Sequence, residues 1–170
     1  MNLRQRYDLV LSVSLTIRGF AFILFEGPRT PVDWGIFDAR GSKKNANCLA
    51  RVSALVRRFR PDLLVLEHTE HISSLRSARV RSLSRDLCAL AEEYGVPLAR
   101  VSRQEIKNAF APLGASTKDE IAEVIAEELP VLVRYLPPTR KPWMSEDARM
   151  GLFDAAALYL ALVERPPRTS

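Results

Sequence analysis

The sequence predicts an α/β protein with a mixed five-stranded sheet, in which three antiparallel strands are followed by two parallel ones, and with helices on both faces. Two observations support this fold class. Three segments rich in aliphatic and β-branched residues open the chain and are joined by links short enough for hairpins. Further along, segments with helical periodicity alternate with short apolar runs, which is typical of parallel strands connected by helices.

The clearest strand signal lies at residues 62–67. Four apolar residues, Leu63 to Leu66, follow a Pro-Asp turn signal, and such a run predicts a strand buried on both faces. Glu67 comes directly after it. Because chemistry in such sheets gathers at the carboxyl ends of the central strands, Glu67 is a candidate catalytic acid. The alternative is that Glu67 is only the first solvated residue after the strand.

The other elements are predicted from residue type and periodicity. The remaining strands are expected at 8–16, 19–27, 31–38 and 96–101. Apolar residues at helical spacing mark the helices, and Ser102 with Glu105 and Thr117 with Glu120 form two capping boxes. The helices are expected at 42–59, 75–94, 102–110, 117–129 and 145–164.

Length and composition fit one domain covering residues 1–164, followed by a short polar tail at 165–170. The hydrophobic content of 47% and the charged content of 26% are those of an ordinary globular protein. The longest apolar runs are too short to span a bilayer and the N-terminus lacks the apolar core of a signal peptide, so a cytoplasmic location is expected. The net charge of +5 permits a nucleic-acid partner.

Two aspartates late in the chain are candidate metal ligands. Asp154 lies in a segment that is apolar nearly all round, where a buried carboxylate must be paired, hydrogen-bonded or metal-bound. Asp147 is expected on nearly the same face of that helix, although an interaction with the helix N-terminus alone also explains it. Gly151 is expected to leave open space above Asp154. With Glu67, such carboxylates suit Mg²⁺, and paired Mg²⁺ ions hydrolyse phosphodiesters.

Arginines interleaved with serines crowd the first turns of the helix expected at 75–94. Cations oppose the dipole at a helix N-terminus, so another interaction should favour them. They are expected to bind phosphate together with hydroxyls and backbone amides, and the alternative is a solvated basic face without a partner. With three basic residues from outside this helix, the predicted nucleic-acid surface consists of Arg18, Arg76, Arg79, Arg81, Arg85, Arg140 and Lys141.

The two tryptophans of the chain, Trp34 and Trp143, are interpreted as core or loop anchors rather than base-stacking platforms.

Several short motifs resemble a known family. The opening segment 10–22, Glu67 after Leu-Val-Leu, and Asp154 within Phe-Asp-Ala-Ala-Ala-Leu resemble the RNase H-like superfamily, and within it the RuvC-type Holliday junction resolvases. The similarity covers roughly residues 8–163. The segments Val-Asp-Trp-Gly at 32–35, Leu-Val-Leu-Glu at 64–67 and 141–150 look like those of uncharacterised bacterial resolvase-like proteins.

The resemblance implies an RNase H-like fold and a Mg²⁺-dependent endonuclease, with Mn²⁺ as a substitute, that cuts branched DNA as a homodimer. It implies that Glu67 and Asp154 bind metal, with Asp147 assisting. The chain departs from the family at Ser14, which stands where the family has its first aspartate. A neutral hydroxyl is a poor substitute for a carboxylate on a hard cation, so metal affinity should fall.

Three functions follow from these observations. The first is a metal-dependent, structure-specific endonuclease of the Holliday junction resolvase type, impaired by Ser14. The second is a catalytically inactive resolvase-like protein that binds structured DNA, or RNA. The third is an actin-like ATPase, which is disfavoured because the chain lacks a second Gly-rich phosphate loop.

Overall fold

The structure is a computed structural model that describes residues 9–68 and 75–164, without the side chains of residues 75–77. The predicted polar tail at 165–170 lies outside the described residues. The elements are β1 (Leu9–Leu15), β2 (Gly19–Glu26), β3 (Pro31–Asp38), α1 (Lys44–Phe59), β4 (Leu63–Glu67), α2 (Leu75–Glu93), β5 (Leu98–Val101), α3 (Arg103–Phe110), η2 (Ala111–Leu113), α4 (Lys118–Glu128), η3 (Pro130–Tyr135) and α5 (Met150–Val163).

The five strands form one mixed sheet in the order β3-β2-β1-β4-β5. The pairs β1–β2 and β2–β3 are antiparallel, whereas β1–β4 and β4–β5 are parallel. The predicted mixed sheet, with three antiparallel strands followed by two parallel ones, is therefore confirmed. The carboxyl ends of β1 and β4 lie side by side at one edge of the sheet.

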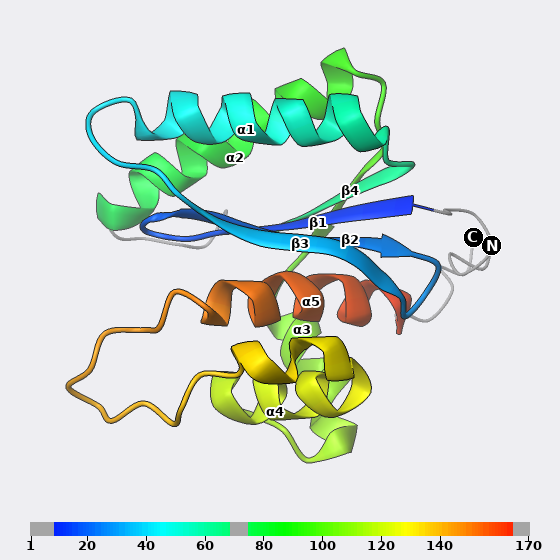
Figure 1. Cartoon of the computed structure of the whole chain (residues 1–170), viewed down its shortest axis with the longest axis vertical. Coiled ribbons are helices and arrows are strands. Elements are labelled where there is room, and N and C mark those ends of the chain that lie inside the picture. The colour runs from blue at the N-terminus through cyan, green and yellow to red at the C-terminus, as the bar shows by residue number, and fades with distance from the viewer. Residues whose placement is uncertain (1–8, 69–74, 165–170) are drawn as a thin grey trace.

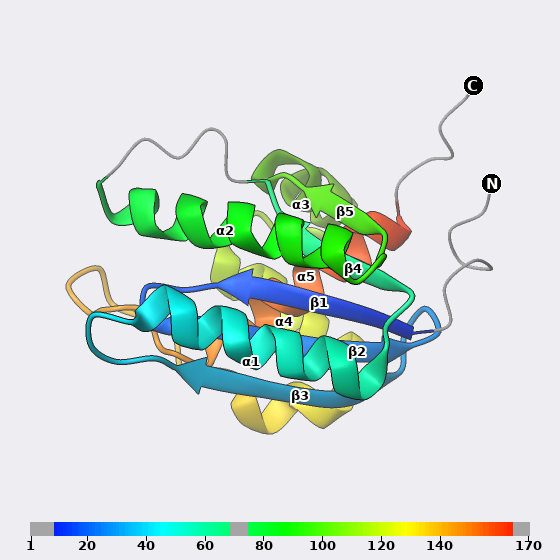
Figure 2. The same ribbon diagram turned by 90° about the horizontal axis from the view of Figure 1, so that it is seen from above.

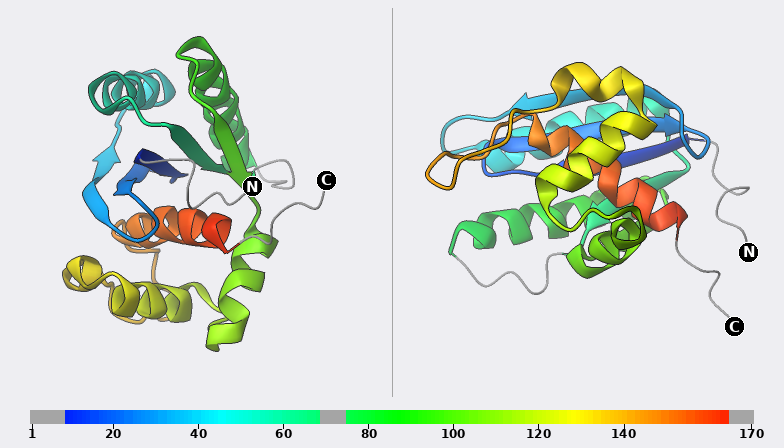
Figure 3. Two further views of the ribbon diagram at one scale, coloured as in Figure 1. Left: turned by 90° about the vertical axis from the view of Figure 1, so that its right-hand side faces the viewer. Right: turned by 90° about the horizontal axis from the view of Figure 1, so that it is seen from below.

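Helices cover both faces of the sheet. In Figure 1, α1 and α2 lie above the sheet and α5 lies below it, with α3 and α4 packed against the outer side of α5. Figure 2 shows α1 and α2 side by side over one face, and Figure 3 shows α5 crossing the other. The described residues hold no helix that is both long and apolar enough to cross a membrane.

Strand β1 contributes side chains to the hydrophobic core on each face of the sheet, because its side chains alternate between the two faces. Leu11 and Val13 pack with α1 and α2, whereas Val10 packs with α5. Ser12 is fully buried on the α5 face, where its hydroxyl donates a 2.6 Å hydrogen bond to the carbonyl oxygen of Ala155. This bond joins the central strand to the helix that carries Asp154.

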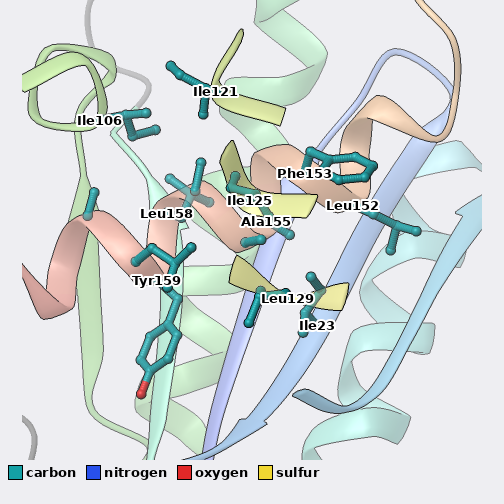
Figure 4. Close-up of a cluster of buried hydrophobic side chains, with 14 of the residues drawn as sticks. Ile23, Ile106, Ile121, Ile125, Leu129, Leu152, Phe153, Ala155, Leu158 and Tyr159 are labelled. Carbon is teal, nitrogen blue, oxygen red and sulfur yellow. The ribbon is translucent and has the colours of Figure 1, made fainter. Parts of the chain in front are cut away.

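Helix α5 is buried along most of its length, as expected because Asp154 is its only charged residue. Figure 4 shows Phe153 and Leu158 among side chains from the sheet and from α4. About one turn after Ala155, the Tyr159 hydroxyl donates a 2.9 Å hydrogen bond to the carbonyl oxygen of Gly27 in the β2–β3 turn. The middle of the helix is therefore bonded both to β1 and to the β2–β3 turn.

The prediction that the last helix starts at Ser145 is wrong, because α5 starts at Met150 and has no side-chain cap. Asp147 lies in the preceding loop. Its carboxylate accepts hydrogen bonds from the backbone N–H and the guanidinium of Arg149, which holds this segment in a turn. Asp147 and Asp154 therefore do not share a helix face.

Gly151 does not leave open space above Asp154 as expected. A Cβ atom at Gly151 would lie 3.0 Å from the Cβ atom of Ala21 and 3.2 Å from the Cγ2 atom of Thr16. The helix backbone packs directly on the β1–β2 hairpin there. A side chain at this position would push α5 away from the sheet.

We expect Gly151→Val to lower the free energy of unfolding by about 1–3 kcal/mol, because overpacking at this contact outweighs the better helix propensity of valine. Urea denaturation followed by circular dichroism measures the change. The control is Ala50→Val, at an exposed position in the middle of α1, which should cost less than about 1 kcal/mol. Equal losses in the two variants would contradict the close approach.

Candidate functional site

A cleft of about 540 Å³ lies at the carboxyl ends of β1 and β4, beside the first turns of α5. Val13 pairs with Leu66, so the residues that follow them, Ser14 and Glu67, are neighbours at the ends of these strands. Asp154 lines the same cleft from α5. The structure thus brings Ser14, Glu67 and Asp154 together in one cleft, which the fourth predicted catalytic residue, Asp147, also lines.

The two carboxylates of this cleft are held in a desolvated environment. Burial raises the pKa of Glu67, Arg103 opposes that shift, and the charge of Asp154 adds to it. Burial also raises the pKa of Asp154, opposed by Lys118 and Arg103. Perturbed acids in a cleft are typical of functional sites.

Lys118 is a cleft residue that sequence analysis did not single out. Its ammonium lies 3.3 Å from Oδ2 of Asp154 and 3.2 Å from Oε1 of Glu146. It is the first residue of α4, where Thr117 and Glu120 form the predicted capping box. The sequence signal here concerns only the start of the helix, and nothing in it indicates that Lys118 meets an aspartate 36 residues away.

Arg103 enters the cleft in the same way, as the first residue of α3. The predicted cap, Ser102, accepts a hydrogen bond from the backbone N–H of Glu105. Two capped helices therefore present basic residues to the acid pair. The two predicted capping boxes located the starts of α3 and α4 correctly. The electrostatic role of Arg103 and Lys118 depends on tertiary packing.

Asp147 also lines the cleft, but its carboxylate is engaged elsewhere. Both of its oxygens accept hydrogen bonds from the Arg149 guanidinium, at 2.9 and 2.7 Å. These bonds lower the pKa of Asp147 to about 2. As a ligand it would first have to give up the contacts with Arg149.

The donor set in this cleft does not fit the two-metal centre that the resemblance implies. Ser14 offers a neutral hydroxyl, Asp147 is bound to Arg149, and Asp154 is paired with Lys118. Residues 9–68 and 75–164 contain no group of three or more His, Cys, Asp or Glu side chains arranged to hold a metal ion. A hard cation needs several oxygen ligands at once, and two of the three predicted carboxylate ligands are already held by basic side chains.

The predicted basic surface on α2 is only partly accessible. The Arg79 guanidinium donates hydrogen bonds to the Thr16 and Ile17 carbonyl oxygens, at 3.0 and 3.1 Å, and to Oδ1 of Asn45 at 2.9 Å. Arg79 therefore fastens the β1–β2 turn to α1 and α2. Arg85 is exposed and Arg81 is half-buried, while the side chain of Arg76 lies outside the described residues.

Two of the three basic residues predicted outside α2 line the cleft, and the third follows one of them on the same loop. Arg18 and Arg140 line this cleft and also a second cavity, of about 540 Å³, beside it. Lys141 follows on the loop between η3 and α5, and its ammonium lies 5.4 Å from the centre of the Trp143 ring. In Figures 1 and 2 this loop projects at the same end of the sheet as the β1–β2 turn.

No protein-family model matches the chain, and no curated protein matches its sequence. Solved structures do share its fold. T. thermophilus RuvC in complex with a Holliday junction substrate has a TM-score of 0.67 at 18% identity, covering 90% of this chain and 91% of that one. A further Thermus thermophilus RuvC structure has a TM-score of 0.64 at 21% identity, covering 90% and 92%.

Fowlpox virus resolvase in complex with Holliday junction DNA is more distant, with a TM-score of 0.52 at 14% identity, covering 89% of this chain and 97% of that one. The predicted RNase H-like fold is confirmed by the match to RuvC, which agrees with the strand order and the directions of the strands. At these identities the comparison establishes the fold, and the function of the cleft has to be argued from its residues.

We expect Glu67→Gln to raise the melting temperature at pH 8, with the difference shrinking towards pH 4. Because the pKa of Glu67 is raised on folding, its contribution to stability is complete below its ordinary pKa of about 4.3 and is lost as the pH rises through the folded value. Glutamine does not titrate. Thermal unfolding across this pH range measures the effect, with the exposed Glu93→Gln as control. A melting-temperature difference between Glu67→Gln and the unaltered chain that stays constant across this pH range would contradict the raised pKa of Glu67.

Proposed function

We propose that this chain binds branched DNA in the cleft at the ends of β1 and β4, as a RuvC-like protein whose catalytic metal centre is incomplete. The observation that carries this proposal is the convergence of Ser14, Glu67 and Asp154 in one cleft whose opening carries arginines. The fold is that of proteins solved with Holliday junction DNA, which supports branched DNA as the ligand class. Structured RNA is the alternative ligand.

The arrangement of charge supports binding of a phosphate backbone. Arg18 and Arg140 border two adjoining cavities, so a DNA strand lying across them would meet both guanidinium groups. Deeper in the cleft, Lys118 and Arg103 offset the charge of Glu67 and Asp154, which would otherwise repel phosphate. We further propose a homodimer, because junction resolvases of this type cut two symmetric strands.

Hydrolysis is a second candidate, favoured by the proximity of Glu67 and Asp154. Burial raises the pKa of Glu67 and the charge of Asp154 adds to that shift, as expected of two carboxylates that face one cleft. This reading keeps Mg²⁺ or Mn²⁺ as the cofactor and Asp147 as an accessory group. Ser14 and the Lys118 ion pair weigh against it, so we place binding first.

Cleavage of a four-way DNA junction in Mg²⁺ and in Mn²⁺ separates the two candidates. We expect the unaltered chain to bind the junction without cutting it, and Ser14→Asp to cut it slowly because a third carboxylate reaches the metal site. The double variant Ser14→Asp, Glu67→Gln is the negative control. Cutting by the unaltered chain that disappears in Glu67→Gln would replace the binding proposal with the hydrolytic one.

Salt dependence of junction binding tests the contact surface. We expect Arg18→Gln with Arg140→Gln to weaken binding and to reduce the slope of log affinity against log salt by about 2, close to one unit for each lost phosphate contact. The matched control is Arg57→Gln with Arg58→Gln. Both arginines are exposed and lie in the last turn of α1. Equal slopes in the two double variants would remove Arg18 and Arg140 from the interface.

A further inference from the structure

The loop between η3 and α5 carries an exposed tryptophan. Trp143 is 78% exposed and its neighbour Met144 is 48% exposed. Arg140 and Ser145, which flank Trp143 and Met144 in the sequence, both line the cleft. The exposed ring of Trp143 is therefore carried two and three residues along the chain from side chains that line the proposed binding site.

Trp143 has no role in the core, contrary to its interpretation as an anchor. Trp34 shows what an anchoring tryptophan looks like in this fold, because it is half-buried and its ring lies edge-on to Tyr135 at 6.5 Å. The Trp143 ring instead meets the Lys141 ammonium at 5.4 Å. This cation–π contact orients the indole and leaves most of its surface in water.

The charge around Trp143 indicates the chemistry of its partner. Both acidic residues that follow it on the loop are held in ion pairs, Glu146 with Lys118, which also pairs with Asp154, and Asp147 with Arg149. The basic residues that precede the indole on the loop are Arg140 and Lys141. An exposed aromatic ring among cations is the arrangement by which proteins stack on nucleic-acid bases while contacting the neighbouring phosphates.

We propose that Trp143 stacks on a base exposed at the branch point of the DNA held in the cleft. This inference rests on the proposed function and adds a basis for selectivity to it. Bases in a linear duplex are stacked on their neighbours and inaccessible to an indole, whereas a branch point offers base faces. Trp143 then distinguishes branched from linear DNA, while Arg18 and Arg140 bind the backbone of either.

Fluorescence of the full-length chain tests this contact directly. The chain contains two tryptophans, so a Trp34→Phe background leaves Trp143 as the single reporter. We expect its emission to be quenched by a four-way junction and to change little with a linear duplex of the same arm sequences. Thermal unfolding of the background variant confirms that it is folded before titration.

Affinity measurements complete the test. We expect Trp143→Ala to lower junction affinity by about 5- to 150-fold, the range that corresponds to one stacked base, and to leave duplex affinity nearly unchanged. Trp143→Phe should retain most of the affinity. Leu113→Ala, at a 55% exposed position in η2, is the control for loss of an exposed apolar side chain.

The outcomes distinguish a failure of the stacking proposal from a failure of the proposed function. If the unaltered chain prefers the junction and Trp143→Ala does not weaken that preference, the stacking proposal is wrong and the proposed function stands. Equal losses on junction and duplex would also overturn it, because they would indicate a general contact. If the unaltered chain does not prefer the junction, the proposed function fails and the role of Trp143 fails with it.

Discussion

The close packing of α5 on the β1–β2 hairpin is the constraint on which the site depends. The Ser12 hydroxyl bonds to the Ala155 carbonyl oxygen, and Gly151 lets the helix backbone approach Ala21. Together these contacts place Asp154 beside the ends of β1 and β4. Helices α3 and α4 in turn pack on the outer side of α5, so the positions of Arg103 and Lys118 follow from the same contact.

The parts of the fold that depend on local chemistry could be predicted from the sequence. Four buried apolar residues before Glu67 marked strand β4, and the Thr117 capping box marked the start of α4. The start of α5 could not be predicted, because Arg149 competes for the Asp147 carboxylate and a turn forms where a capped helix was expected. The Lys118 ion pair depends on how α4 packs against α5, which no local pattern indicates.

Within the cleft, three acidic side chains are in contact with two basic ones. Lys118 joins Glu146 and Asp154, and Arg149 holds both oxygens of Asp147. Internal pairing of this kind reduces the local field that an isolated acid cluster would produce, and a divalent cation is attracted by that field. The arrangement suits the holding of a phosphate backbone better than the activation of water.

Gly151 also limits how this sequence can change over evolutionary time. Any side chain there meets Ala21 and Thr16. A larger residue at position 151 would be tolerated only after the hairpin had changed at Thr16 or Ala21. Substitutions at these three positions are therefore coupled, and the residues acceptable at one depend on those present at the other two.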